Sequence, residues 1–180
     1  SSFKIEGRLK DVAYVKNVTA YYRKRLDEIF KRRREYIRAS SGEVKLAFKP
    51  QLDKSFTRGF TNYFLFERNK DIFSFDTPKS LGEEMGYVKE IRGNYIIVAG
   101  VKPFNNGDGI CYLDKGFAIN RIEGNWLFPN IQVSGIEKSL IGTTLYRNLD
   151  NEFLRSLRAE RRIPIAVRFI AIPEGYRLTI

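Results

Sequence analysis

The side chains with the clearest capacity for chemistry are the cations near the start of the chain. Residues 1–40 hold 12 Lys or Arg against 5 Asp or Glu, which accounts for most of the net charge of +11. Because a localised basic surface attracts phosphate backbones, these cations make nucleic acid a candidate partner. The side chains selected for such contacts are Arg23, Lys24, Lys31, Arg32, Arg34 and Arg58. A solvated helix face is the simpler interpretation of the helical cations, and docking on an acidic partner is a third.

A second group combines aromatic rings with a cation. Five rings fall within a short stretch interrupted by Arg58 and Gly59, namely Phe56, Phe60, Tyr63, Phe64 and Phe66. Platforms on which nucleic-acid bases stack also combine aromatic and basic side chains. A core or interface strip between two units is the interpretation that we favour from sequence alone.

The residue types on which most enzymes rely are scarce. The chain has no histidine and one cysteine, Cys111. No Ser-His-Asp or Cys-His mechanism and no histidine-based metal site can form without histidine. Cys111 fits a small core residue of a strand, and Gly107-Asp108-Gly109 fits a turn. Glu83 and Glu84 are adjacent, so on a strand they would point to opposite faces. We therefore predict no catalytic residue, metal site or cofactor within this chain.

One long helix must position the basic side chains. Apolar residues recur at steps of three and four from Val12 to Phe30, in a stripe about 120° wide. Asp11 precedes them as a helix N-cap, and the helix should run to about Tyr36 or Ile37. Residues 2–6 alternate apolar and polar before Gly7, which predicts a short strand.

The remainder of the chain indicates strands. Turn signals at 92–94, 114–116 and 123–125 separate segments typical of strands, at 85–91, 95–99, 110–113, 117–122, 126–128 and 142–146. A short helix at 148–160, capped by Asp150, and a hairpin of 163–172 with 176–180 follow. Short strands joined by tight turns indicate a small antiparallel barrel or sandwich. The predicted fold class is α+β, mainly β, with a long N-terminal amphipathic helix beside a small antiparallel β-barrel.

These elements suggest four parts. Residues 1–40 are the first strand and helix, 41–80 a connector with the aromatic stretch, 81–148 the small barrel, and 149–180 the short helix and trailing hairpin. The last part either completes the barrel or starts a further domain. The chain opens without a Met and has a strand at each end, so we expect a portion of a longer protein.

Several stretches, in a specific order, resemble one known family. They are residues 2–10 (SFKIEGRLK), 14–15 (YV), 21–23 (YYR), 55–61 (SFTRGFT), 76–83 (DTPKSLGE), 86–89 (GYVK), 107–110 (GDGI) and 142–148 (GTTLYRN). This pattern resembles the U32 family of peptidases, also called collagenase-like proteases, from the end of the catalytic barrel through a C-terminal small β-barrel. The resemblance covers most of the chain.

The resemblance carries its own expectations. It implies that residues 2–37 are the last strand and helix of a truncated α/β barrel, and that the small barrel is similar to the second domain of translation elongation factors. Some members hydroxylate transfer or ribosomal RNA, and an iron–sulfur cluster would be held by cysteines outside this chain. Glu6 and Arg8 would lie at the C-terminal end of the last barrel strand, where barrel active sites form, so they are candidates for substrate contact. A buried ion pair closing the barrel is the alternative role for them.

Three functions remain open on these grounds. The first is a non-catalytic accessory module of a U32-type peptidase that positions substrates or partners. The second is an RNA-binding module of an RNA-hydroxylating enzyme, and the third is an interdomain scaffold. The expected partners are the rest of a parent chain, RNA, and a second copy paired through the N-terminal strand. One cysteine suits a reducing compartment, and no apolar run reaches the roughly 20 residues of a membrane span, so we expect a cytoplasmic protein.

Overall fold

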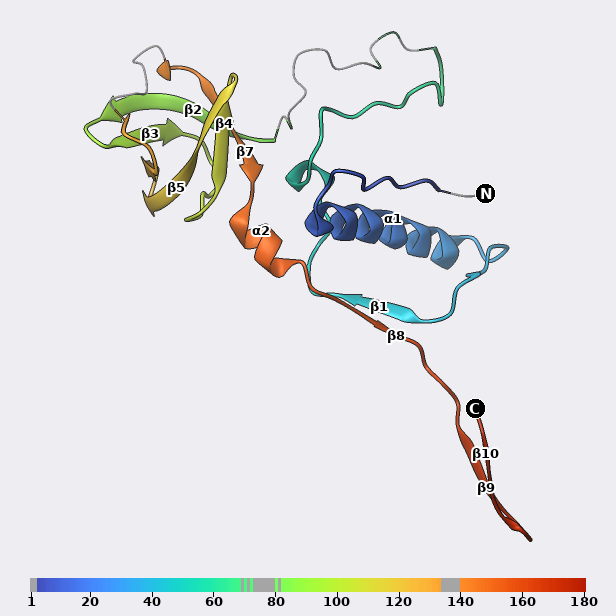
Figure 1. The fold of residues 1–180 in the computed structure, drawn as a ribbon. Helices are drawn as coiled ribbons and strands as arrows, with labels where there is room; N and C mark the ends of the chain where they lie inside the picture. Colours follow the sequence, from blue (N-terminus) through green and yellow to red (C-terminus); the bar gives the residue numbers. More distant parts are fainter. Residues whose placement is uncertain (1–2, 69, 71, 73–79, 81, 134–139) are drawn as a thin grey trace.

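The computed structural model describes residues 3–180, except 69, 71, 73–79, 81 and 134–139. It is mainly β with one long N-terminal helix (Figure 1). The predicted motif at 76–83 therefore lies largely outside the described residues. No helix among the described residues has the length and apolar content to cross a lipid bilayer.

The long helix α1 spans Val12–Arg32. Its start is as predicted, because Asp11 Oδ1 accepts a hydrogen bond from Tyr14 N at 2.7 Å. Its end comes four or five residues earlier than expected, since Arg33 is extended. The apolar stripe ends at Phe30, and Arg33 occupies the next position on it. No further apolar burial therefore supports another turn.

The apolar stripe of α1 is largely exposed, although its periodicity predicts that it is buried. The buried residues are Asn17, Val18 and Ala20, whereas Val12, Val15, Tyr22 and Ile29 are exposed. The helix packs instead on a single 3-10 turn, η1 (Leu52–Lys54).

The predicted N-terminal strand is absent from the described residues. Residues 3–7 have no strand geometry, and residue 2 lies outside the described part. A strand requires a hydrogen-bonded neighbour, and these residues lie along α1 instead. The Phe3 ring is 6.4 Å from that of Tyr22.

Six strands close into an antiparallel ring, which we call the ring sheet. They are β2 (Glu83–Arg92), β3 (Tyr95–Ala99), β4 (Gly109–Tyr112), β5 (Lys115–Glu123), β6 (Trp126–Pro129) and β7 (Thr144–Leu149). Their order around the ring is β2-β3-β6-β5-β4-β7, so each strand is hydrogen-bonded on both sides. The predicted hairpin turns at 92–94, 114–116 and 123–125 are confirmed, with strand ends shifted by one to three residues.

The core of the molecule lies inside the ring sheet. Inward side chains from every strand are almost fully buried, among them Met85, Val88, Ile96, Ile110, Ile119, Leu127 and Leu145. Alternate residues point in and out, as in a sheet with one solvated face. Gly86 occurs at a register shift of β2 with a positive φ of 128°, and a Cβ there would lie 2.2 Å from Ala99 O. The ring closes at this point because a side chain is absent.

The remaining elements lie outside the ring. Helix α2 (Asn151–Ser156) is shorter than the predicted 148–160, although Asp150 caps it as expected. Strand β8 (Ala159–Arg162) pairs with β1 (Glu43–Leu46), and neither strand was predicted. The predicted C-terminal hairpin is confirmed as β9 (Arg168–Ile172) with β10 (Gly175–Thr179), which extends away from the other elements (Figure 1).

The aromatic stretch is not part of a core. Phe60, Tyr63, Phe64 and Phe66 are all exposed, the last at 81%. Of the preferred interpretation, a core or interface strip, the core part is therefore wrong for this chain, which leaves an interface strip or a stacking surface.

Candidate nucleic-acid interface

A cleft lies between the N-terminal segment, α1 and the segment that follows η1. Its volume is about 900 Å³. The cations on its wall are Lys4, Lys10 and Arg58, and the rings are Tyr14, Tyr22, Phe56 and Phe60. We call it the basic–aromatic cleft. It brings together residues from four of the stretches that carry the family resemblance, 2–10, 14–15, 21–23 and 55–61.

Asn17 fixes the distance between the two sides of this cleft. It is fully buried on α1, and its amide nitrogen donates to Gln51 O at 2.5 Å and to Ser55 Oγ at 2.6 Å. Its carbonyl accepts from Gln51 N at 2.9 Å. The amide thus satisfies both backbone groups of Gln51, so η1 is held against the helix. Phe56 follows Ser55 directly, and the cleft wall is placed by this contact.

The tip of that wall is a small hydrogen-bonded turn. Thr57 Oγ1 accepts from Gly59 N and donates to Gly59 O, each at 3.1 Å. Gly59 has a φ of +110°, and a Cβ there would meet no atom within 4 Å. The backbone conformation, rather than space, therefore calls for glycine. Ser80 Oγ binds both Thr57 N and Thr57 O at 3.2 Å, which secures the turn from the other side.

The three cations of the cleft differ in how they are engaged. Lys4 Nζ is 2.7 Å from Glu6 Oε1, in an exposed pair. Lys10 Nζ lies 3.3 Å from the centre of the Phe56 ring, a cation–π contact. Arg58 is exposed and makes no hydrogen bond, ion pair or ring contact within the described residues. It is therefore the cation of the cleft best placed to contact an anion.

The predicted substrate contacts are only partly brought together. Glu6 lines the cleft, but Arg8 is exposed and does not line it. The alternative of a buried ion pair is wrong for this chain, because Glu6 pairs with Lys4 and 69% of its side chain is exposed.

The predicted phosphate contacts on α1 fall into two groups. Arg23 Nη2 is 2.5 Å from Asp27 Oδ1, which also accepts from Arg38 at 2.6 Å. Burial raises the pKa of Asp27, but the hydrogen bonds and charges of these two arginines outweigh it and hold that pKa below its usual value. Lys24, Lys31, Arg32 and Arg34 are exposed and have no such partner within the described residues. None of these α1 cations lines the cleft, which contains only Arg58 of the predicted set.

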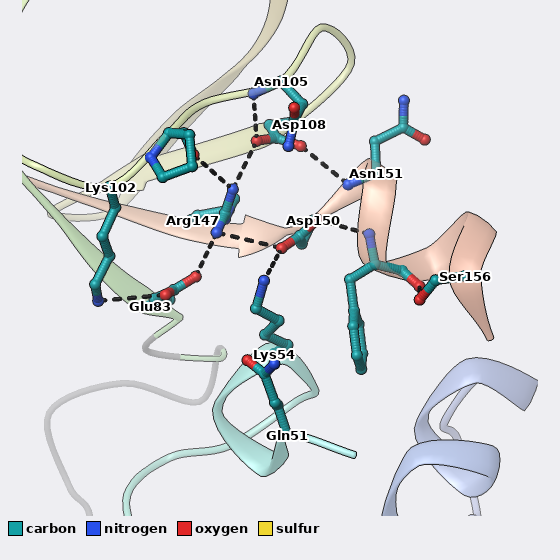
Figure 2. A network of polar contacts seen from close by, with 12 residues as sticks. Gln51, Lys54, Glu83, Lys102, Asn105, Asp108, Arg147, Asp150, Asn151 and Ser156 are labelled. Atoms are coloured by element: carbon teal, nitrogen blue, oxygen red, sulfur yellow. Dashed lines mark hydrogen bonds and ion pairs between the residues drawn. The ribbon is translucent and has the colours of Figure 1, made fainter. Parts of the chain in front are cut away.

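A buried network ties η1 and α2 to the ring sheet (Figure 2). Arg147 Nη2 is 2.6 Å from Glu83 Oε2 and 3.2 Å from Asp150 Oδ2, and its Nη1 is 3.1 Å from Asp108 Oδ2. Lys54 Nζ reaches Asp150 Oδ2 at 2.5 Å. Since Lys54 is in η1, the same turn that Asn17 holds against α1 is also bound to the ring sheet.

The carboxyl groups of this network are shifted by their partners. Burial raises the pKa of Asp150, but hydrogen bonds from Lys54 and from Phe153 N, with the charge of Arg147, lower it below the usual value. Burial likewise opposes ionisation of Glu83, and Arg147 and Lys102 outweigh it, so its pKa is also lowered. Both groups are thus held as anions in the folded chain.

Sequence patterns missed the residues that build this site. Lys4, Lys10 and Asn17 are not among the residues that the sequence predicts for a site. The available signal for Asn17 was an amide inside the helical segment where apolar residues predominate. Arg147 offered no signal, because two of its three carboxylate partners, Glu83 and Asp108, are far away along the chain.

Comparisons with known proteins place the chain among relatives by sequence. Residues 1–73, which contain α1 and nearly the whole cleft wall, match the model of peptidase family U32. They are a U32 region. The chain as a whole is similar to the 23S rRNA 5-hydroxycytidine C2501 synthase of Escherichia coli (strain K12), with 38% identity over 191 aligned positions. The alignment covers 99% of this chain and 29% of that protein, so the chain spans less than a third of its relative. No solved structure matches the chain. The U32 region thus continues into a β part that is shared with an RNA-modifying relative.

Proposed function

We propose that this chain is an RNA-binding module of a protein that hydroxylates RNA. The observation that carries the proposal is the set of exposed cations without partners within the described residues, Lys24, Lys31, Arg32 and Arg34 on or just after α1 and Arg58 in the cleft. Ion-paired cations would gain little from a phosphate, whereas these release counterions when they meet one. The name of the relative, which specifies 23S rRNA, supports the same partner.

The chemistry of hydroxylation would have to come from residues outside this chain. An iron–sulfur cluster needs several thiolates, and Cys111 is the single cysteine. No group of three or more His, Cys, Asp or Glu residues suited to a metal occurs in the part of the chain that the structure describes. We therefore assign the residues of this chain to binding rather than to a reaction step. The protein that contains them is proposed to be cytoplasmic.

The ring sheet belongs to this proposal as a supporting element. Its six antiparallel strands and buried core are consistent with a small β-barrel similar to the second domain of translation elongation factors. It would hold η1, and through it the cleft wall, at a fixed place relative to the RNA.

The accessory peptidase module is the competing proposal, and the description of the U32 family favours it. It predicts binding of peptides without a steep dependence on salt. An interdomain scaffold predicts neither. The name of the relative favours RNA over both.

The test is binding of the full chain to a labelled fragment of 23S rRNA across a salt series. The double variant K24Q/R34Q removes two unpaired cations. It leaves Lys31 and Arg32 in the last turn of α1, where their positive charges stabilise the helix by interacting with its dipole. We expect weaker binding at low salt. The slope of log affinity against log salt should fall by about 1.4 to 1.8, because each lost phosphate contact removes about 0.7 to 0.9.

The matched control is R168Q/R177Q, which removes two exposed cations from the distant β9–β10 hairpin (Figure 1). It should leave the salt slope unchanged. Equal losses of RNA affinity in K24Q/R34Q and R168Q/R177Q would mean that binding depends on the net charge alone. Absence of binding by the wild-type chain at low salt would refute the proposed function.

A further inference from the structure

We propose that the basic–aromatic cleft binds an unpaired base of single-stranded RNA, stacked on the ring of Phe60, with Arg58 on a neighbouring phosphate. This inference rests on the proposed function and adds the kind of RNA and the place where it binds. Of its side chains, Arg58 is shared with the proposed function and Phe60 is new, and the K24Q/R34Q variant that tests the proposed function changes neither.

Phe60 is the ring of the cleft that is free to stack. It is 70% exposed and makes no ring contact within the described residues. Phe56 already carries Lys10 on its face at 3.3 Å. Tyr22 contacts the rings of Phe3 and Tyr21 at 6.4 and 5.6 Å. Tyr14 also has no ring partner within the described residues, but it is only partly exposed, so Phe60 is the most exposed ring that a base entering the cleft meets.

The charge of the cleft suits a strand with exposed phosphates. Its wall has three cations, Lys4, Lys10 and Arg58, against the single carboxylate of Glu6. Lys4 neutralises Glu6, and Lys10 is engaged with Phe56, so Arg58 supplies the unpaired positive charge next to Phe60. An aromatic ring adjacent to a cation is the arrangement that accommodates a base and its phosphate in single-strand binders.

The cleft is also held ready for a ligand. Asn17 fixes η1, the hydrogen bonds between Thr57 and Gly59 shape the turn, and Ser80 secures it. Arg58 and Phe60 thus flank a glycine in a defined conformation. Because the wall of the cleft is already ordered before a ligand arrives, binding costs less conformational entropy.

A duplex does not meet the same requirements. Its bases are stacked on one another, so no face is available to Phe60, and RNA is read mainly where bases are unstacked. The volume of about 900 Å³ lies at the upper end of the roughly 300–1,000 Å³ typical of ligand sites, so the cleft has room for a base with its sugar and phosphate.

The experiment measures binding of the full chain to a single-stranded oligoribonucleotide that contains 2-aminopurine, with a duplex of the same sequence as comparison. Wild type should quench the fluorescence of the analogue through stacking and bind the single strand more tightly than the duplex. F60L keeps an apolar side chain but removes the ring. It should weaken binding about 5- to 150-fold and abolish quenching, because stacking on one ring is worth about 1–3 kcal/mol.

Two variants separate stacking from structure. F60W restores a ring and should restore quenching. F66L removes an equally exposed ring that does not line the cleft, so it should behave as wild type. R58Q should weaken binding and lower the salt slope by about 0.7, while quenching persists at saturation.

The outcomes distinguish the two proposals. The proposed function stands if wild type binds RNA and the K24Q/R34Q substitutions weaken this binding. In that case the present inference is still overturned if F60L binds like wild type, or if the duplex binds as tightly as the single strand. If an acidic peptide binds the cleft and RNA does not displace it, the inference is overturned in favour of a peptide. If wild type binds no RNA, both proposals fail.

Discussion

Arg147 shows that a single arginine can organise three carboxylates that are distant in the sequence. It is 5% exposed, and its guanidinium group contacts Glu83 from β2, Asp108 from the loop before β4, and Asp150 at the start of α2. Lys54 and Lys102 complete the charge balance of the network. The fork of the guanidinium group, rather than its charge alone, allows these contacts.

Replacing Arg147 with Met should destabilise the chain strongly. The buried carboxylates would lose their shared partner, and breaking a buried ion pair from one side costs about 3–5 kcal/mol. R147K, which keeps the charge without the fork, should fall between Met and wild type. Urea denaturation at pH 7 measures the effect, and R92M, which removes an exposed partner of Glu90, serves as control. A midpoint for R147M near that of R92M would show that the network contributes little.

At the scale of single residues, the sequence indicated which side chains matter but not which other side chains they contact. It placed Asp11 and Asp150 as helix caps, because a cap lies next to the helix that it serves. It selected Arg58 by the rings around it. It could not pair Arg147 with Asp108, since residues 39 positions apart meet only through the ring sheet.

The single turn η1 connects the two larger parts of the molecule. Asn17 holds it to α1 from one side, and Lys54 holds it to Asp150 from the other. The backbone of Gln51 has both its donor and its acceptor satisfied by the Asn17 amide. The cleft wall depends on this turn, because Phe56 to Phe60 follow it directly.

Replacing Asn17 with Leu should release η1 without unfolding the ring sheet. Two backbone groups of Gln51 and the hydroxyl of Ser55 would lose their partner, which costs about 1–3 kcal/mol for a group left unsatisfied. Hydrogen exchange should therefore accelerate at residues 51–57 and stay slow in β2 and β3. T19A, at an exposed position of the same helix, is the control. Faster exchange throughout the ring sheet would contradict a local role for Asn17.

Local patterns predicted most elements because their signals are local. Glycine turns and alternating apolar residues located the strands of the ring sheet and the final hairpin. The pairing of β1 with β8 escaped prediction, because both segments are only four residues long and largely exposed and their partners are more than 100 residues apart. The exposed face of α1 likewise could not be foreseen, since periodicity says which residues share a face but not what covers it.

Charge is distributed over the whole molecule in two different ways. Lys24, Lys31, Arg32, Arg34 and Arg58 are exposed and unpaired within the described residues, whereas the cations around Arg147 are matched by carboxylates. The first group is available to a partner, and the second stabilises the fold. Net charge alone, which the sequence supplies, does not separate them.

Stability should fall when the pH drops below about 4. Glu83 and Asp150 have pKa values lowered in the folded chain, so their contribution is complete above the unfolded values near 4 and is lost as the pH falls through the lower folded values. Between about pH 5 and 7 these groups add no pH dependence, and the chain has no histidine to supply one.

Denaturation at a series of pH values from 7 to 3 measures this effect. R147M lacks the main cation of the network, so its loss of stability at low pH should be smaller than that of wild type. Parallel curves for the two proteins would show that the acid sensitivity arises elsewhere.

The pairing of β1 with β8 also constrains the order in which the chain can assemble. Residue 46 meets residue 159, so this ladder closes a loop that contains the entire ring sheet. Within that loop, Glu83 pairs with Arg147, which brings the entrance and the exit of the ring sheet together. Once the ring sheet has formed, the remaining loop is less than half as long, and closing it costs about 0.7 kcal/mol less in chain entropy. A ladder of four exposed residue pairs has little free energy with which to offset that cost. The ring sheet should therefore fold first. Strand β1 should pair with β8 only after the folded ring sheet has brought the two segments close together.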